Sequence, residues 1–373
     1  MLVDLTCIDF RNLVELHVDV HPRFNIFEGN NGQGKTNLIE AIYLQATLRS
    51  FREARTKTMI RWGQPTATIR STIDNSGVER TLAVELSDKG KRVALDGRSV
   101  TRTSDYLGQL RVVVFSSEDL AITKAGPALR RRFLDRAIYG VRTSYIEEAR
   151  AFMRALKSRN TLLKQHIGRT LEPSLLEAFD LEFARHSAEV ITQRLKYIAQ
   201  FKPVFEANLR SITSDKMESD ITYQSSASIG PDVDIDNIQN AMLEVLSRSL
   251  SVDRRRGFTT SGPHSDDLVF KSDGRPVRQY ASQGQHRALA LALKISELQL
   301  SEEVSGSTPI LLLDDVSSEL DEERNRTLME HLDKSGGQVF ITTTDRRWIQ
   351  IKSASRVFEV SNGSILANEV IGT

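Results

Sequence analysis

The residues with the clearest capacity for chemistry form one glycine-rich stretch near the start of the chain, Gly29 to Thr36. The stretch fits the pattern G-x-x-x-x-G-K-[ST], with strand-like residues before it and helix-like residues after it, which is the setting of a phosphate-binding loop. Glycines let the backbone turn tightly and bring its N–H groups against phosphate oxygens, and the following helix adds the positive end of its dipole. A nucleotide-phosphate site is therefore predicted at Gly29, Asn30, Asn31, Gly32, Gln33, Gly34, Lys35 and Thr36.

Two acids far along the chain complete this chemistry. Residues 309–313 form an apolar run typical of a buried parallel strand, and Asp314 and Asp315 follow it directly. In a nucleotide site, Lys35 would reach the β- and γ-phosphates, and Thr36 would hold Mg²⁺ together with Asp314. Asp315 is then the candidate for polarising the attacking water, so the predicted catalytic residues are Lys35, Asp314 and Asp315. The alternative is a core strand that ends in two solvated acids.

A second helix start has the composition of an anion site. Ser282 and Gly284 precede the apolar helical run Ala288 to Ile295, and free N–H groups at such a helix N-terminus attract anions. Because the first loop already accounts for one nucleotide, we expect this site to meet the γ-phosphate held by a second copy of the chain. The alternative is that Ser282 is an N-cap and nothing more. The predicted contact residues are Ser282, Gln283, Gly284 and Gln285.

The segments around these motifs indicate an α/β fold. Residues 1–28 read as three short strands that lead to the loop, and residues 66–115 carry further strands separated by hairpin turns. This pattern indicates a β-rich lobe attached to the nucleotide core, with residues 112–115 as a central buried strand. Residues 338–344 form another strand, whose polar tip should reach the γ-phosphate side of the site.

A helical region separates the two groups of motifs. Apolar residues recur at spacings of three and four between Leu134 and Leu156, which predicts one long helix, and they recur again between Leu176 and Val204. A break near residues 166–173 lets the two helices pair as an antiparallel hairpin. The predicted domains are the N-terminal half of a nucleotide domain with its β-rich lobe (1–120), an inserted helical arm (121–255), and the C-terminal half (256–373).

Composition favours a folded cytoplasmic protein. The 373 residues are 39% hydrophobic and 27% charged, which is enough to bury cores in two or more domains. No apolar run approaches the roughly 18 residues of a membrane span, and the first residues do not read as a leader. The single cysteine, Cys7, cannot form an internal disulfide, which suits a reducing compartment.

The motifs, in this order around a helical insertion, resemble the ABC-type ATPases of the SMC and Rad50 branch. The likeness is greatest to the RecF family of bacterial recombination mediators, because residues 115–120, 130–135 and 262–268 also resemble sequences of that family. It extends over essentially the whole chain. The second helix start reads Ser-Gln-Gly-Gln, where transporter subunits usually have Ser-Gly-Gly-Gln, and this difference argues against a transporter.

The resemblance implies a specific role for each motif. Gly29 to Thr36 would bind ATP and Mg²⁺, and Asp314 would be the Walker B acid. Ser282 and Gly284 would form the signature that contacts ATP across a head-to-tail homodimer. In the stretch Ser318 to Asp321, the last residue would be the D-loop acid at the dimer interface. The switch position would be Thr343 or Thr344.

The resemblance also implies what such a dimer does. Family members would dimerise with ATP on duplex or gapped DNA, hydrolyse ATP in a slow, DNA-stimulated reaction, and help to load recombinase together with RecR and RecO type mediators. Slow turnover is expected because Asp315, with its shorter reach, stands where many ABC ATPases have Glu. The implied setting is the cytoplasm, next to the nucleoid, in DNA repair, replication, recombination and the SOS response.

Basic residues near the start of the helical region are the candidates for DNA contacts. Residues 121–160 contain ten Lys or Arg against three acids, although the net charge of the whole chain is only +1. A clamp would hold DNA through its phosphates without base readout. The alternative is that these basic residues only form a solvent-exposed helix face. The candidates are Arg130, Arg131, Arg132 and Arg136, with Lys57 and Arg61 in the β-rich lobe as weaker ones.

Two other classes of function stay open. One is a nucleotide-binding subunit that couples ATP to a membrane partner, which the lack of amphipathic or long apolar segments disfavours. The other is a different SMC-like ATPase, or a structural module in which ATP only joins two copies without significant turnover. A kinase or small GTPase fits least, because neither class needs the motif at Ser282.

Overall fold

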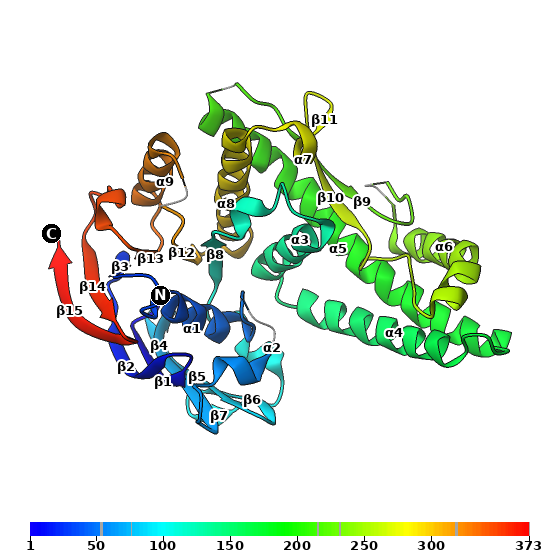
Figure 1. The fold of residues 1–373 in the computed structure, drawn as a ribbon, viewed down its shortest axis with the longest axis horizontal. Coiled ribbons are helices and arrows are strands. Elements are labelled where there is room, and N and C mark those ends of the chain that lie inside the picture. Colours follow the sequence, from blue (N-terminus) through cyan, green and yellow to red (C-terminus); the bar gives the residue numbers. More distant parts are fainter. Residues whose placement is uncertain (53–54, 76, 215, 231–232, 318–319, 373) are drawn as a thin grey trace. The chain divides into compact units, whose positions relative to one another are not determined.

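The computed structural model describes residues 1–52, 55–75, 77–214, 216–230, 233–317 and 320–372. By its internal contacts the chain forms two compact units. Unit 1 combines residues 1–120 with residues 301–373, and unit 2 comprises residues 121–300. Both chain ends therefore belong to unit 1, as the blue and red segments of Figure 1 show. Compact units need not coincide with functional domains, so the boundaries predicted at residues 120 and 255 stay predictions.

The core of unit 1 is a six-stranded, largely parallel sheet with the order β15-β14-β3-β13-β12-β8. Strands β14, β3, β13, β12 and β8 run parallel, so their carboxyl ends meet at one edge, and β15 pairs with β14 in the antiparallel sense. Every residue of β12 and β13 is buried, which agrees with the apolar run that begins each strand. The bounds are β3 Phe24–Glu28, β8 Val112–Ser116, β12 Ile310–Asp314, β13 Val339–Thr343, β14 Ser355–Ser361 and β15 Ser364–Ile371.

Strand β8 differs from its predicted place in the sheet. It is buried, as its apolar residues indicated. Among the described strands, however, it pairs with β12 alone and lies at the end of the strand order. The prediction of a central strand is therefore wrong. An apolar run indicates that both faces of a strand are buried. It does not indicate which strands pair with it.

A second sheet of unit 1 is antiparallel throughout, with the order β2-β1-β4-β5-β6-β7. Helix α1 (Lys35–Thr47) contacts strands of both sheets and is buried along nearly its whole length. The phosphate-loop motif therefore leads into a helix that belongs to the core. The strand bounds are β1 Asp4–Phe10, β2 Leu13–Asp19, β4 Thr66–Asn75, β5 Val78–Ser87, β6 Gly90–Leu95 and β7 Arg98–Ser99. The remaining helical segments are η1 Thr56–Met59, α2 Thr103–Tyr106, η2 Asp119–Ala121, α9 Glu322–Lys334 and η3 Arg346–Trp348.

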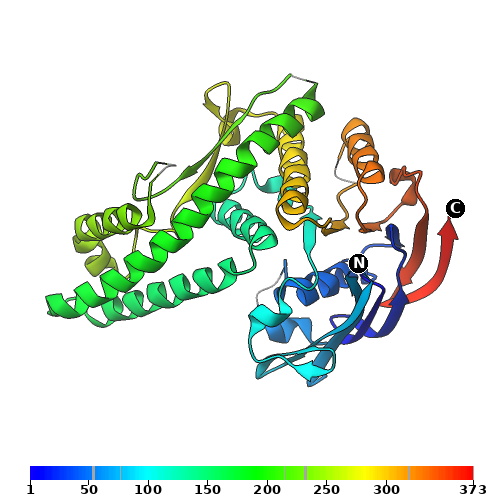
Figure 2. The same cartoon turned by 180° about the vertical axis from the view of Figure 1, so that it is seen from behind.

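Unit 2 is mainly helical. Helices α4 and α5 lie side by side and run antiparallel, as Figure 2 shows, which confirms the predicted hairpin. Phe133, Phe183, Phe201 and Phe205 are buried in one apolar cluster that joins α3 and α5 to a small sheet of order β11-β10-β9. The bounds are α3 Pro127–Val141, α4 Tyr145–Gln165, α5 Pro173–Thr213, β9 Asp220–Gln224, α6 Ile235–Arg256, β10 Asp267–Ser272, β11 Arg275–Pro276, α7 Val277–Tyr280 and α8 Gln283–Ser305.

The long helix predicted between Leu134 and Leu156 is two helices in the structure. Helix α3 ends at Val141, where the next residue, Arg142, takes extended dihedral angles, and α4 begins at Tyr145. The Tyr145 hydroxyl donates a hydrogen bond of 2.6 Å to Asp135 of α3, which fixes the turn between the two helices. Apolar spacing persisted across the turn because both helices face the same core. In the described part of the chain, no helix is long and apolar enough to cross a bilayer.

Buried charges hold the helices of unit 2 together. The Arg159 side chain, fully buried in α4, donates hydrogen bonds to Asp180 of α5 (2.6 Å) and to Asp253 of α6 (2.8 Å). A third hydrogen bond, of 2.8 Å, goes to the Thr259 hydroxyl. Asp253 also accepts hydrogen bonds from the Thr260 N–H and hydroxyl. The guanidinium of Arg159 is therefore the counter-charge for carboxylates from two other helices.

We predict that Arg159→Met destabilises the protein by about 3–5 kcal/mol, because it leaves buried carboxylates without a counter-charge. Thermal unfolding of the full chain measures the effect. Arg154→Met is the matched control, since Arg154 is exposed on the same helix, and it should change stability by less than about 0.5 kcal/mol. Equal effects of the two substitutions would show that the buried arginine is not structural.

Candidate nucleotide-binding site

The glycine-rich loop joins the end of β3 to the start of α1, as predicted. Two of its glycines are required by their surroundings. Gly29 has a φ of 155°, and a Cβ atom there would lie 2.3 Å from the backbone oxygen of Val360. Gly34, the N-cap of α1, has a φ of 111°, and its Cβ would lie 2.9 Å from Asn12 Oδ1. Larger residues cannot adopt this conformation without displacing neighbouring atoms, so the loop shape depends on both glycines.

The Lys35 side chain curls back over the loop. Its Nζ atom donates hydrogen bonds to the backbone oxygens of Gly29 (2.6 Å) and Asn30 (2.8 Å). Burial lowers the pKa of Lys35, and the negative charges of Asp315 and Asp314 oppose this shift. A cation is thus fixed against the loop backbone, where it can neutralise an anion that the loop encloses.

Gln33 anchors the outer side of the loop. Its backbone oxygen accepts a hydrogen bond from the Gly363 N–H (2.8 Å), and its side-chain oxygen accepts one from the Asn362 N–H (2.7 Å). The loop is therefore held from the β14–β15 turn as well as by its own strand and helix. The Gln33 side chain therefore helps to hold the loop in place.

Thr36 and Asp314 are brought together from distant parts of the sequence. The Thr36 hydroxyl donates a hydrogen bond of 2.8 Å to Asp314 Oδ1, and the Thr342 hydroxyl donates one of 2.9 Å to the same oxygen. Burial raises the pKa of Asp314, while the two hydroxyl donors favour its ionised form. Hydroxyl and carboxylate oxygens are ligands that Mg²⁺ prefers, so this pair fits the predicted metal position.

The rest of a magnesium site would have to come from other oxygen donors. Within the residues described here, no group of three or more His, Cys, Asp or Glu side chains is placed to hold a metal ion. Mg²⁺ commonly keeps several waters and takes the remaining ligands from a substrate phosphate. One hydroxyl and one carboxylate from the protein are consistent with such a coordination, in which waters and phosphate oxygens supply the other ligands.

Asp315 and the β13 tip stand beside this pair. Asp315 has a φ of 53° in the left-handed region, and its N–H donates to the Thr342 hydroxyl at 3.0 Å. Thr343 is buried, and its hydroxyl donates to the backbone oxygen of Asp345 at 2.9 Å. Thr344 is exposed and lines a pocket with Gly29 and Asn30. Of the two predicted switch residues, only Thr344 therefore presents an accessible hydroxyl next to the loop.

A pocket of about 1080 Å³ adjoins the start of α1, and sequence reasoning missed it. Asn37, the second residue after Lys35, donates to Asn12 at 2.7 Å and accepts from Arg52 at 3.0 Å, which builds one wall. Trp62, whose side chain is 99% exposed, also lines it. Lys57 and Arg61, the weaker DNA candidates, line this pocket too, and Arg61 forms an ion pair with Asp9 at 3.2 Å. In the sequence, Trp62 directly follows Arg61, and nothing there indicated a pocket.

The second predicted anion site lies in unit 2, at the start of α8. The Gln285 N–H donates to the Ser282 hydroxyl (3.2 Å), and the Ser282 N–H donates to the Gln285 side chain (2.7 Å). These reciprocal bonds form a capping box, so Ser282 is an N-cap. Ser282 and Gln283 are nevertheless exposed, while Gly284 and Gln285 are partly buried. The box uses the Gln285 N–H, and the N–H groups of Gln283 and Gly284, in the first turn, have no acceptor within the helix.

His286 fixes the first turn of α8. It is buried, and its Nδ1 atom forms a hydrogen bond of 2.7 Å with the Thr123 hydroxyl, close after η2. Burial lowers the pKa of His286, and the charge of Lys124 lowers it further. The exposed residues Ser282 and Gln283 are therefore presented from a rigidly anchored helix start.

Asp321 is the N-cap of α9 in unit 1. Its side chain accepts a hydrogen bond of 3.0 Å from the Arg324 N–H and forms an ion pair with the Arg324 side chain. Ser318 and Glu319, the start of the same motif, lie outside the described residues. The predicted interface acid is therefore fixed by a local cap.

Two of the predicted DNA contacts are used inside unit 2. Arg130 is buried and donates to both oxygens of Asp267 at 2.7 Å and to the backbone oxygen of Ala125 at 2.6 Å. Such a side chain does not reach a ligand on the surface, which corrects its assignment as a DNA contact. Arg131 is half-buried and donates to the backbone oxygen of Asp266 at 2.7 Å. Arg136 is also half-buried, and Arg132 is exposed.

Comparison with known proteins identifies the family. A sequence model described as RecF/RecN/SMC N terminal domain matches residues 1–365. The DNA replication and repair protein RecF of Geotalea daltonii is 38% identical over 359 residues, which cover 96% of this chain and 97% of that protein. RecF of Myxococcus xanthus is 41% identical over 339 residues, covering 90% and 89%. This chain belongs to the RecF family.

Solved structures agree with this assignment. A structure described as the recombination mediator protein RecF-ATPrS in the RecFOR pathway has a TM-score of 0.91, 32% identity, and coverage of 98% of both chains. A Smc head domain from Pyrococcus furiosus, 15% identical with a TM-score of 0.56, shares the fold. The predicted ABC-type ATPase head, with a β-rich lobe and an inserted helical hairpin, is therefore confirmed for this RecF family member.

The buried position of Asp314 predicts a pH-dependent stability. Because burial raises its pKa in the folded chain, the folded state binds more protons than the unfolded state between that value and the ordinary Asp pKa of about 3.9. The contribution of Asp314 to stability therefore falls as pH rises through this window. Asp314→Asn removes the ionisable group and keeps an oxygen that accepts from both hydroxyls.

We predict that Asp314→Asn raises the unfolding temperature at pH 7, and that the gain shrinks as the pH is lowered toward 4. Thermal unfolding of both proteins at several pH values measures it. Asp105→Asn, at an exposed position, corrects for the loss of one negative charge. A gain that grows on acidification would contradict the burial argument.

Proposed function

We propose that this protein is an ATP-dependent DNA clamp of recombinational repair. In this proposal, two copies associate head to tail around ATP on duplex or gapped DNA, and slow ATP hydrolysis separates them. The observation that carries the proposal is the contact between Thr36 and Asp314 at a glycine-rich loop, in a chain that shares its fold with RecF structures solved with ATP and an ATP analogue. In this proposal, unit 1 binds the nucleotide and unit 2 contacts the nucleotide that the partner copy holds.

Unit 1 supplies the groups that hold the nucleotide. The N–H groups of Gly29 to Thr36 and the Nζ atom of Lys35 bind its phosphates. Thr36 and Asp314 would hold a Mg²⁺ ion, and the ion would supply positive charge against the phosphates. The adenosine part lies in the neighbouring pocket, where Arg52 offers charge and Trp62 offers a flat apolar surface.

Hydrolysis needs a base, and Asp315 is the candidate because it directly follows β12, which ends at Asp314. In the proposed step, Asp315 accepts a proton from water while the water oxygen attacks the γ-phosphorus, and ADP leaves with its β-phosphate oxygen. Thr344 orients that water from the end of β13. The short side chain of Asp315 and its hydrogen-bonded backbone keep it near β12, which supports slow turnover.

Unit 2 supplies what the loop of the other copy lacks. Ser282, Gln283 and Gly284 contact the γ-phosphate held by the partner copy, and Asp321 of unit 1 lies at the same interface. The exposed start of α8 and its anchor at His286 support this use. A site divided in this way exists only in the dimer, so ATP binding and dimerisation are linked.

The relatives supply the biological setting of the proposal. Their names describe DNA replication and repair proteins, and the solved structures are placed in the RecFOR pathway. We therefore assign this chain the same setting, in the cytoplasm beside the nucleoid, with RecO and RecR type proteins as partners. Arg132 and Arg136 remain candidates for contacts with the DNA backbone.

Mixing two inactive variants tests the shared site. Lys35→Arg removes the loop function and Ser282→Arg blocks the helix start with a bulky cation, so each protein alone should hydrolyse ATP at a small fraction of the wild-type rate. In a mixed dimer, the loop of the Ser282→Arg copy meets the intact helix start of the Lys35→Arg copy. Mixing equal amounts should therefore restore about a quarter of the wild-type rate, since half the dimers are mixed and each has one intact site.

The control keeps both lesions in one chain. Mixing the double variant Lys35→Arg/Ser282→Arg with Lys35→Arg leaves no dimer with an intact loop and should restore nothing. Rates that stay at the level of the single variants in the first mixture would contradict the shared site. Circular dichroism of each variant verifies that it is folded.

A further inference from the structure

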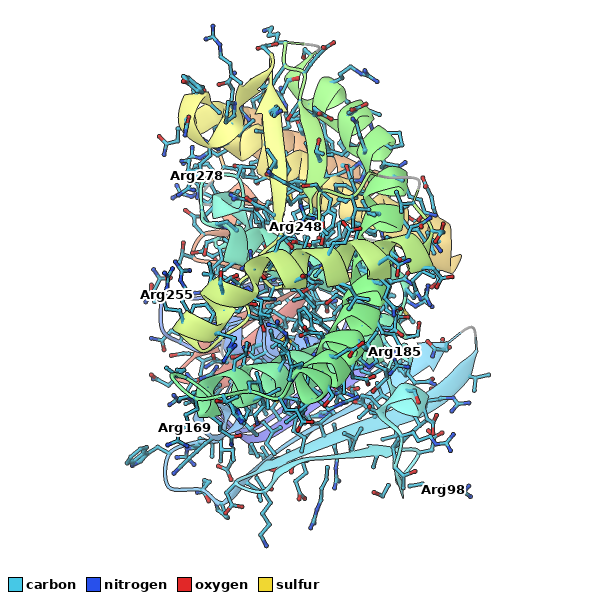
Figure 3. The ribbon with its side chains drawn as sticks, turned by 90° about the vertical axis from the view of Figure 1, so that its right-hand side faces the viewer. Arg98, Arg169, Arg185, Arg248, Arg255 and Arg278 are labelled. Carbon is cyan, nitrogen blue, oxygen red and sulfur yellow. The ribbon has the colours of Figure 1, made fainter. Side chains whose placement is uncertain are left out.

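One end of unit 2 carries cations that the proposed mechanism does not use. Lys164 lies in the last turn of α4, Arg169 lies in the connection to α5, and three arginines form the last turn of α6. All five are exposed. Figure 3 labels Arg169 and Arg255 on the same side of unit 2. We call this set the basic end: Lys164, Arg169, Arg254, Arg255 and Arg256.

Direct contacts hold the two segments of the basic end against each other. Arg254 donates a hydrogen bond of 3.1 Å to the backbone oxygen of Arg169. Gly257, with a φ of 73°, ends α6 so close to the α4 connection that a Cβ atom there would lie 2.5 Å from Ile167 Cδ1. The Thr259 N–H also donates to the Asn160 side chain at 2.7 Å. The cations are therefore gathered by the fold, although about 90 residues separate them in sequence.

Among the described residues, no carboxylate forms an ion pair with the basic end. None of its five side chains forms an ion pair with any residue that the structure describes, and segments 164–171 and 254–258 contain no acid. Asp253, directly before Arg254, is buried and bonded to Arg159. Two exposed arginines elsewhere in unit 2 do have a carboxylate partner: Arg185 pairs with Glu182, and Arg248 lies 3.8 Å from Glu244.

Helix dipoles account for only part of this charge. Helices α4 and α6 both end here, and each helix C-terminus carries roughly half a negative charge, so the two ends together attract about one cation. Five cations exceed that need severalfold. Mutual repulsion between them costs free energy, which an external polyanion would recover on binding.

We propose that the basic end binds the phosphate backbone of DNA, a surface additional to the residues predicted near Arg132. The identity of the polyanion rests on the proposed function. Arginine side chains contact phosphate oxygens without reading base sequence, as a clamp requires. An acidic protein partner is a weaker fit, because stable protein interfaces need an apolar centre, and the segments 164–171 and 254–258 expose two large apolar residues, Ile167 and Phe258.

The test uses arginines whose side chains form no hydrogen bond or ion pair with any described residue. The variant Arg169→Gln/Arg255→Gln/Arg256→Gln leaves the Arg254 hydrogen bond in place. The control, Arg98→Gln/Arg185→Gln/Arg248→Gln, removes the same charge at exposed positions that Figure 3 also labels. Binding to a DNA duplex with a single-stranded arm is measured with ATP and magnesium over a salt series, and thermal unfolding verifies the fold.

We expect the first variant to bind at least about tenfold more weakly at moderate salt, and its plot of log K against log salt to be shallower by about 2 to 3. The control should stay close to the wild type. The proposal is overturned if both variants lose DNA affinity equally, or if the first variant loses none. It is also overturned by a first variant that keeps its DNA affinity and loses an acidic partner protein. A wild-type protein that binds no DNA at all instead refutes the proposed function itself.

Discussion

The hydrogen bond from Thr36 to Asp314 joins two points that are 278 residues apart in the chain. Most features of unit 1 serve to hold those two groups. Helix α1 is buried against both sheets, which fixes Thr36, and the fully buried β12 brings Asp314 to the sheet edge. The constraint is electrostatic, because a buried carboxylate whose pKa is raised by burial costs stability and is kept where the chemistry needs an anion.

The sequence was informative wherever the signal was local. Glycines, the Lys-Thr pair and the apolar run before Asp314 each specify a short segment, and the structure places all of them as expected. Relations between segments were harder to infer. The place of β8 at the sheet edge depends on strand pairing, and the pocket beside Asn37 combines residues from four separate stretches of unit 1. Neither leaves a pattern in any one stretch of sequence.

The pairing of charged side chains shows most clearly that relations between distant segments are hard to infer from the sequence. Residues 121–160 carry many cations, yet Arg130 and Arg159 fold inside unit 2 against Asp267 and Asp253. Asp267 and Asp253 lie 137 and 94 residues away from these arginines, so composition alone counted both arginines as surface charge. In the described part of the chain, five exposed cations without an ion pair lie together where α4 and α6 end. Folding, and not local composition, decides which charges reach solvent.

The central claim is that ATP completes a site shared by two copies of the chain. The most direct measurement is the molar mass of the wild-type protein by light scattering, with magnesium and saturating ATP, with ADP, and without nucleotide. The account predicts twice the monomer mass of 41.9 kDa with ATP and the monomer mass in the other two conditions. A monomer mass with ATP, both free and bound to DNA, would contradict it.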